Sequence, residues 1–340
     1  MATRNRAGYI GEALDSVIEQ AAGDVEIVIV DGASTDRTEE VVRLRQARFP
    51  GIRYFRQDSA NGVDRDFSRA AELARGEYCW FMCDDDALRP GAIERVLRET
   101  REGYGLIVVN AAILDVELKT ILEPRSLRWS RDRSYAPGER ERLLADVAGY
   151  LSFIGGVVIR RAVWRSRERE RYYGTMFLHV GVIFQAPLPE PALAIAEALV
   201  SIRYGNASWS GDWFDIWLFR WPSLIWSFDL PDRAKARVIE REPWRNLRAL
   251  TAARAKGAYS LREYRRWISP RLAWSRQRLL AGLIAVLPGM PLNAAAWLYG
   301  RLFKPGSRVA MADIRNSPFY PPRYLRRLLS RGAASSYATS

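Results

Sequence analysis

Three consecutive carboxylates, Asp84, Asp85 and Asp86, follow an apolar run from Tyr78 to Cys83. Like charges a few ångströms apart raise one another's pKa unless a cation lies between them. Oxygen ligands favour Mg²⁺ or Mn²⁺ over zinc, and Mg²⁺ is commonly held by one or two carboxylates together with substrate phosphates. The alternative is an acidic cap for the helix expected at Pro90. Because capping needs only one Asp, we predict a divalent metal site with Asp85 and Asp86 as ligands.

A second acidic loop follows the apolar strand expected over residues 25–30. It reads Asp31-Gly32-Ala33-Ser34-Thr35-Asp36, and a helical pattern begins at Thr38. Taken alone, Asp31 and its neighbours are explained as turn or cap residues. Ligands of parallel sheets bind beyond the carboxyl ends of the strands, however, so both acidic loops are expected at one site.

The elements that must position these loops alternate along the chain. Strands are expected over residues 25–30, 52–55, 78–83, 105–114 and 151–159, with helices from Thr38, over 65–75 and from Pro90. This alternation predicts an α/β fold with a mostly parallel sheet covered by helices on both faces.

Length and composition limit the class of protein. A chain of 340 residues with 48% hydrophobic and 27% charged residues suits a folded protein with one large domain and an appendage. Cys79 and Cys83 lie in one apolar run, without the partners of a zinc site, and we expect buried thiols in a reducing compartment. No secretory signal is visible at the start, so we expect the protein to stay in the cytoplasm.

The basic charge belongs to the second part of the chain. Residues 216–340 hold 23 Lys+Arg against 6 Asp+Glu, a net charge of +17, while residues 1–215 hold 29 against 33, a net charge of −4. A nucleic-acid-binding protein would explain a basic, aromatic tail, but it would not explain the acidic loops.

The tail also carries apolar features. Trp209, Trp213, Trp217 and Trp221 are spaced four apart, as on one helical face, and residues 279–300 contain no charge but are broken at Pro288-Gly289-Met290-Pro291. We expect residues 216–331 to form helices that rest on the inner face of the plasma membrane, contacting anionic lipid. The alternative is that these residues are ordinary core. Residues 332–340 are expected to fray.

Three segments together resemble glycosyltransferase family 2. They are residues 25–38 (VEIVIVDGASTDRT), residues 78–90 (YCWFMCDDDALRP) and the opening Thr3-Arg4-Asn5-Arg6. The resemblance is good over residues 1–115, loose over 116–210 and nearly absent in the tail. Within the family, residues 61–67 (NGVDRDF) and 203–209 (RYGNASW) are most similar to abequosyltransferase-type sugar transferases of O-antigen synthesis.

The resemblance implies a GT-A fold over residues 1–215 and an inverting, metal-dependent transfer of sugar from a nucleotide-sugar donor. The acceptor that it implies is a lipid-linked saccharide of cell-surface polysaccharide synthesis. The nucleotide is then bound by Thr3, Asn5, Arg6, Asp31, Asp36, Asn61, Asp64 and Asp84, and catalysis involves Asp86.

The chain departs from the family pattern at the acceptor's base. Many members carry a Glu-Asp pair there, whereas residues 173–180 (YGTMFLHV) contain the only histidine of the chain, His179. We predict that His179 is the general base or positions the acceptor, since its ordinary pKa of about 6.5 suits proton transfer near neutrality. The alternative is a packed, hydrogen-bonded histidine.

Two further departures concern the sheet and the acidic motif. The family has an apolar first strand before the Thr-x-Asn-Arg segment, whereas this chain begins almost at that segment. Either the start was assigned too late, or the strand is missing and the nucleotide site is weakened, which keeps a non-catalytic scaffold of the same fold as an alternative. The family's Asp-x-Asp falls on Cys83 and Asp85 when counted from Pro90. Which carboxylate contacts the metal is therefore left open.

Overall fold

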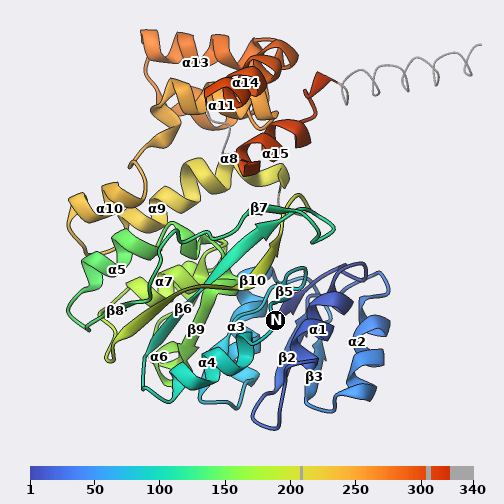
Figure 1. Ribbon diagram of the computed structural model, residues 1–340. Helices are drawn as coiled ribbons and strands as arrows, with labels where there is room; N and C mark the ends of the chain where they lie inside the picture. The colour runs from blue at the N-terminus through green and yellow to red at the C-terminus, as the bar shows by residue number, and fades with distance from the viewer. Residues whose placement is uncertain (207–209, 304–307, 322–340) are drawn as a thin grey trace, which may run out of the picture. The chain divides into compact units, whose positions relative to one another are not determined.

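The computed structural model describes residues 1–206, 210–303 and 308–321 and divides the chain into two compact units. The first contains residues 1–204 and 223–240, and the second contains residues 205–222 and those from 241 onward (Figure 1). The boundary expected after residue 215 lies within a segment of the second unit, and the tail expected to fray, residues 332–340, lies outside the described residues.

A three-stranded parallel sheet opens the first unit, in the order β1 (Ala2–Thr3), β2 (Ile27–Asp31), β3 (Ile52–Arg56). Thr3 lies opposite Asp31, so the loops after β1 and β2 leave the same edge of the sheet. The first strand, which one of the two explanations took to be missing, is present as the two residues of β1.

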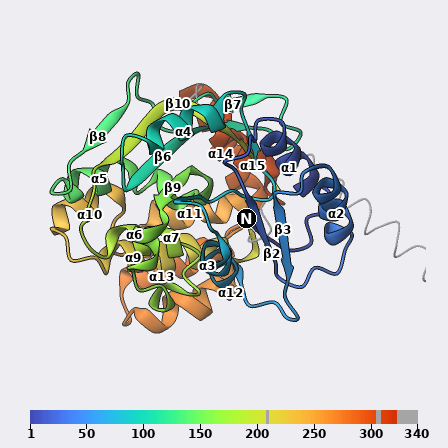
Figure 2. The same ribbon diagram turned by 90° about the horizontal axis from the view of Figure 1, so that it is seen from below.

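Helices cover both faces of this sheet. The side chains of β2 point alternately to the two faces, so each face has apolar residues to bury. Ile27 and Ile29 pack into the core that contains the buried face of α1 (Ile10–Ile18) and Val42 of α2 (Thr38–Arg48). Val28 and Val30 pack on the opposite side against α3 (Val63–Leu73). Figure 2 shows α1 and α2 on one side of β2 and α3 on the other. Burial on both faces agrees with the apolar character of the strand expected over residues 25–30.

The second sheet of this unit is mixed. Its order is β4-β9-β6-β10-β5, with β7 paired to β6 and β8 paired to β10. The strands are β4 (Tyr78–Trp80), β5 (Ala87–Leu88), β6 (Leu106–Leu114), β7 (Ile121–Glu123), β8 (Arg133–Tyr135), β9 (Val157–Arg160) and β10 (Ala192–Arg203). Parallel pairing, predicted for most of the sheet, holds for β1–β3 and for β6 with β10, while the other pairs of this sheet are antiparallel.

Short loops explain part of this difference, since only antiparallel strands can be joined by a tight turn. Such a turn, held by the side chain of Asp115, joins β6 to β7. The strand predicted over residues 78–83 ends at Trp80, and the one predicted over 151–159 begins only at Val157, after 3₁₀ turns. Helix α4 (Ala92–Thr100) begins after Gly91, which has a left-handed φ of 78°, and not at Pro90.

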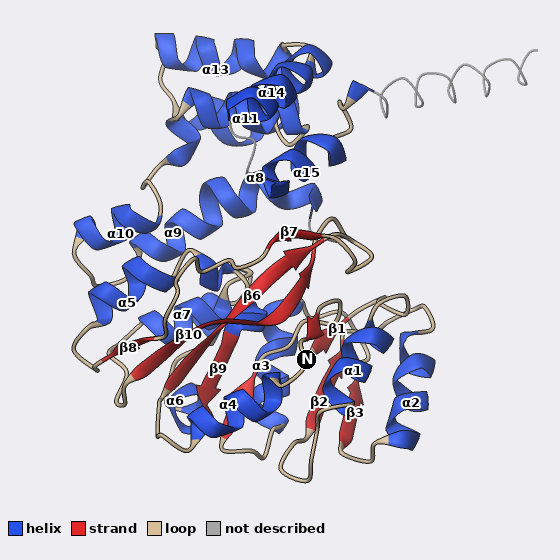
Figure 3. Cartoon of the chain, viewed as in Figure 1, coloured by secondary structure: helices blue, strands red, loops and turns tan. Residues whose placement is uncertain are grey.

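Further helices complete the first unit (Figure 3). They are α5 (Arg140–Val147), α6 (Arg161–Arg165), α7 (Leu178–Phe184) and α10 (Asp232–Val238). Helix α9 (Trp221–Trp226) begins in the second unit and ends in the first.

The described residues of the second unit form helices joined by loops, without strands. This unit contains α8 (Trp213–Asp215), a π-helix (Ile216–Arg220), α11 (Leu247–Lys256), α12 (Leu261–Glu263), α13 (Arg276–Val286), α14 (Gly289–Phe303) and α15 (Arg308–Asn316). Asn246 caps the start of α11 by accepting hydrogen bonds from two backbone amides with its side chain, and Gly257, in a left-handed conformation, caps its end. The described residues include no single helix long and apolar enough to cross a bilayer; α13 and α14 reach that length together but are bent by 95°.

The predicted tryptophan stripe is partly buried in the protein, and its member Trp217 is half-buried. Trp221 is buried, and Trp213 packs against the core of the second unit formed by residues such as Phe214, Leu218 and Tyr259. Trp209 lies outside the described residues. The alternative that the sequence left open is therefore correct for Trp213 and Trp221.

Candidate active site

The loops that follow β1 and β2 are joined by hydrogen bonds. The Asn5 amide donates to Ser34 Oγ at 2.9 Å, and Asn5 Oδ1 accepts from the Thr35 amide at 2.7 Å. The Arg6 amide donates to Thr38 Oγ1 at 2.8 Å, and Asp36 accepts from the amides of Ala7 and Thr38. Asn5 has a left-handed φ of 55°, which asparagine tolerates well. These contacts hold the two sequence motifs as one surface.

Asp31 is fully buried beneath this surface. Its Oδ1 accepts from the Ser34 amide at 2.7 Å, and its Oδ2 accepts from the Tyr54 hydroxyl at 2.6 Å. Burial and the Asp31 carboxylate raise the pKa of Tyr54, so the phenol remains a donor. Gly32 is the next residue, and a Cβ atom at this position would lie only 2.7 Å from Asp66 Oδ2. Asp31 thus orients the loop from below, and Gly32 allows the close approach of α3.

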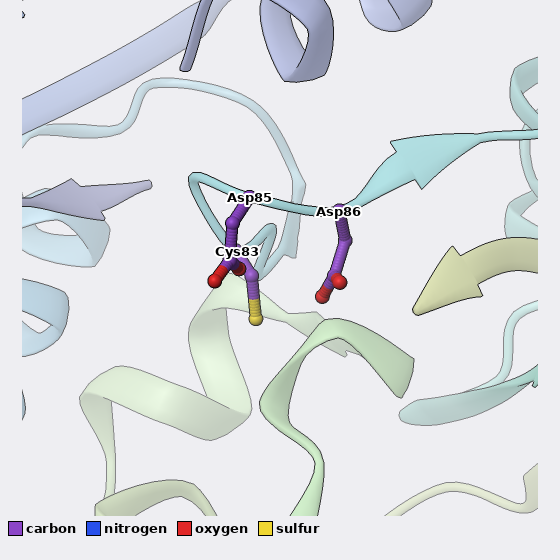
Figure 4. A group of neighbouring side chains, drawn as sticks. All are labelled: Cys83, Asp85 and Asp86. Atoms are coloured by element: carbon purple, nitrogen blue, oxygen red, sulfur yellow. The ribbon is translucent and has the colours of Figure 1, made fainter. Parts of the chain in front are cut away.

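The acidic cluster lies beside this surface, and Arg6 connects the two. Arg6 Nε is 3.6 Å from Asp84 Oδ1, and its Nη2 is 3.6 Å from Asp85 Oδ2. Asp84 and Asp86 are buried, and Asp85 is half-buried. Figure 4 shows the Asp85 and Asp86 carboxylates and the Cys83 thiol on the same side of the loop. The two acidic loops predicted to share a site are therefore brought together.

Burial of like charges perturbs this cluster. Burial raises the pKa of Asp84 to about 7 and that of Asp86 to about 8, and the neighbouring Asp85 charge adds to both increases. Burial also raises the pKa of the Cys83 thiol well above its ordinary value. A divalent cation would offset this repulsion, since an opposite charge favours the ionised carboxylate.

The residues of the cluster fit a hard divalent cation. A carboxylate oxygen from each of Asp85 and Asp86 and Cys83 Sγ lie within 4.8 Å of one another. Mg²⁺ and Mn²⁺ prefer oxygen ligands to the sulfur of a thiol, so the two carboxylates are the members of this group that suit such an ion.

Arg203, at the end of β10, holds the acidic loop from behind. Its backbone amide donates to Asp86 Oδ1 at 2.8 Å, and its Nε donates to the Asp85 carbonyl at 2.7 Å. The guanidinium is buried, pairs with Glu12, and lies over the ring of Tyr9 at 5.2 Å. The motif that contains Arg203 gave no indication of this role, because the residues that Arg203 contacts are distant in sequence.

The α3 region contributes two residues predicted to bind nucleotide, Asn61 and Asp64. Asn61 is exposed and donates to Gln57 at 2.6 Å, whereas Asp64 is buried. Asp64 accepts from the amides of Gly174 and Met176 at 2.8 and 2.9 Å and of Leu178 at 3.3 Å. Asp64 therefore positions the segment before α7, a role that the sequence did not indicate.

His179 lies on α7 with only 2% of its surface exposed. Its Nε2 is 2.6 Å from the Leu151 carbonyl oxygen, so this nitrogen carries the hydrogen and donates. Burial lowers the pKa of His179 to about 4. This geometry matches the packed histidine that the sequence left as an alternative, and it does not support the predicted general base, because a base must reach the acceptor.

Comparison with known proteins agrees with this geometry. Residues 1–163, which carry both acidic loops, match the sequence model of Glycosyl transferase family 2. The match covers just under half of the 340 residues.

Two curated relatives and two solved structures are similar to the chain. The abequosyltransferase RfbV of Salmonella typhimurium is 29% identical over 199 residues, which are 54% of this chain and 60% of RfbV. The GalNAc(5)-diNAcBac-PP-undecaprenol beta-1,3-glucosyltransferase of Campylobacter jejuni is 32% identical over 112 residues, which are 33% of this chain and 36% of that protein. The matched part is therefore less than two thirds of either relative.

The solved structures show the fold. S. aureus TarS 1–349 superposes with a TM-score of 0.57 at 17% identity, over 92% of this chain and 89% of TarS. The mannosyltransferase PcManGT of Pyrobaculum calidifontis, in complex with GDP-Man and Mn²⁺, gives a TM-score of 0.51 at 17% identity, over 93% of this chain and 85% of that one. The fold is of the GT-A type, as the sequence predicted.

Proposed function

We propose that this chain transfers a sugar from a nucleotide-sugar donor to a lipid-linked saccharide acceptor, with inversion at the anomeric carbon. The observation that supports this most is the junction of three loops, residues 3–7, 31–38 and 84–86, with Arg6 within 3.6 Å of both Asp84 and Asp85. The family of residues 1–163 supports sugar transfer, and the name of the Campylobacter relative, which includes PP-undecaprenol, supports a lipid-linked acceptor.

In this proposal the three loops bind the donor's nucleotide diphosphate. The exposed Asn5 and the Arg6 guanidinium face the nucleotide, while the buried Asp31 holds their loop in place. Asp85 and Asp86 hold a divalent ion, which, when bound, supplies positive charge to the departing diphosphate. Arg6 adds a second positive charge beside the same phosphates. Asp86 keeps its orientation because the Arg203 amide holds one of its oxygens.

The acceptor side of this proposal uses the segment that Asp64 positions. Residues 174–178 precede α7, and their amides are held by the Asp64 carboxylate. His179 supports this segment through its bond to Leu151 rather than serving as the base. A lipid-linked acceptor also implies that the protein works at the inner face of a membrane, in contact with anionic lipid through the C-terminal region.

A panel of nucleotide sugars tests this function. We expect one donor to raise the melting temperature and to be turned over only with Mn²⁺ or Mg²⁺ present. Asp85→Asn and Asp86→Asn should each lower turnover by about 100-fold or more. Asp24→Asn, at an exposed position, is the matched control and should change nothing. Near-normal turnover by both variants in EDTA would show that the proposed metal dependence is wrong. If no nucleotide sugar of the panel bound, the proposed sugar transfer would be refuted.

A further inference from the structure

The two helices α13 and α14 present large apolar side chains to the outside. Leu279, Leu283 and Val286 of α13 and Leu298, Leu302 and Phe303 of α14 are each 50–69% exposed. Residues 279, 283 and 286 recur at the spacing of one helical face, as do 298 and 302. We call these six residues the outer apolar face.

The side of the same helices that faces the core carries small residues. Ala281 and Ala285 of α13 are buried in the core of the second unit, and Gly289 and Asn293 of α14 are buried as well. Figure 1 shows both helices beside α11, which contacts each of them. A helix of a water-soluble protein buries its large apolar residues and exposes polar ones. The reversed arrangement indicates that a medium other than water covers the outer apolar face.

The charged residues along this stretch of the sequence have one sign. The sequence contains no charged residue between Arg278 and Arg301, and residues 264–312 contain no Asp or Glu. Trp274, 79% exposed, precedes α13 with the Arg278 guanidinium 4.9 Å from its ring centroid, and Arg271 and Arg276 on either side are exposed. Tryptophan prefers the headgroup level of a bilayer, and arginines there attract anionic lipid.

We propose that the outer apolar face inserts shallowly into an anionic phospholipid surface, with α13 and α14 lying in the plane of the interface. The helices have 11 and 15 residues and are therefore about 16 and 22 Å long, less than the roughly 30 Å of a hydrocarbon core. They meet at a bend of 95°, and both can lie along one surface. The inference rests on the proposed function for its purpose, since it brings the chain to a lipid-linked acceptor.

Flotation of the full chain with vesicles tests the proposal. Vesicles of phosphatidylethanolamine and phosphatidylglycerol should bind the wild type, and phosphatidylcholine vesicles should bind it at least tenfold more weakly. Leu283→Glu combined with Leu302→Glu should weaken binding to the anionic vesicles by at least tenfold. The folded state should tolerate both changes because the positions are exposed. Leu44→Glu, at a leucine of the first unit that is 61% exposed, is the matched control and should bind like the wild type.

Two results would overturn the proposal. One is unchanged flotation of the double variant. The other is a wild type that does not bind anionic vesicles but forms a dimer, while the double variant stays monomeric. A second copy of the chain would then cover the outer apolar face. The metal-dependent thermal shift with a nucleotide sugar is measured on the same variants without lipid. It should be unchanged in all of them, so a failed proposed function and a failed membrane contact give different results.

Discussion

Replacement of His179 by Gln tests whether this histidine is a packed residue or a base. The side chain is 2% exposed, donates from Nε2 to the Leu151 carbonyl, and has a pKa lowered to about 4 by burial. A glutamine amide can donate to the same carbonyl but does not titrate. Any pH dependence that disappears in the variant therefore belongs to the imidazole.

The magnitude follows from linkage between protonation and folding. Because the folded-state pKa lies below the ordinary value of 6.5, the unfolded chain binds the proton more tightly. The stability contributed at pH 7 is therefore lost as pH falls from about 6.5 toward 4. From these two pKa values the loss between pH 7 and pH 5 is about 2 kcal/mol. Asp84 and Asp86 act in the opposite direction, since their raised pKa values make the folded state gain stability as pH falls from 8.

The comparison of the two proteins isolates the histidine. The free energy of unfolding is measured in urea at pH 5, 6 and 7, with EDTA present, for the wild type and for His179→Gln. The difference between them should shift by about 2 kcal/mol in favour of the variant at pH 5. With every affinity tag removed, the chain has one histidine, so an NMR titration of its ring gives the pKa directly. A ring that titrates near 6.5, together with loss of turnover in the variant, would refute the packed assignment and restore the base.

The positions that hold the site lead to further expectations. Arg203→Lys should weaken Mn²⁺ binding by about 10- to 100-fold, because lysine lacks the planar guanidinium that holds the Asp85 carbonyl. The affinity is measured in a titration followed by electron paramagnetic resonance, with Arg89→Lys, at an exposed position, as the control. Equal Mn²⁺ affinity of the two variants would show that Arg203 does not position the acidic loop. Asp64→Asn should lower the free energy of unfolding by about 2 kcal/mol, since it loses a charged acceptor of three backbone amides, with exposed Asp58→Asn for comparison. Gly32→Ala should raise the KM for the donor by displacing Asp66, whereas Gly8→Ala, where a Cβ meets no atom within 4 Å, should not; equal KM values would show that the close approach is unimportant.

Several strands and helices were predictable because their signals are local. Val25 to Val30 is an apolar run that ends in a polar loop, and the strand β2 with the helix at Thr38 follows directly. The strand expected over residues 78–83 ended early, at Trp80. Apolar character after that point reports burial rather than a continued strand, since Phe81 and Met82 are buried outside any strand, although the Phe81 amide still donates to the Val157 carbonyl.

The apolar residues of the C-terminal region show the same limit. The sequence contains both a tryptophan stripe and an uncharged stretch, and only the packing shows which of their side chains are buried and which are exposed. Trp221 is buried, whereas Leu283 and Leu302 are exposed, because α13 and α14 bury their small residues instead. Periodicity identifies a face of a helix but does not say whether protein or solvent covers it.

The sequence by itself determined the two acidic loops, the match of residues 1–163 to a family model and the carboxylates that we propose as cation ligands, because these depend on residue types next to one another in the chain. Only the tertiary structure decided which side chains surround them. It placed Arg203 behind Asp85 and Asp86, placed Asp64 under residues 174–178, and buried His179 against Leu151. These contacts join residues far apart in sequence, so no local pattern encodes them. The pKa of His179 depends on how much water remains around the ring, which only the packed chain sets.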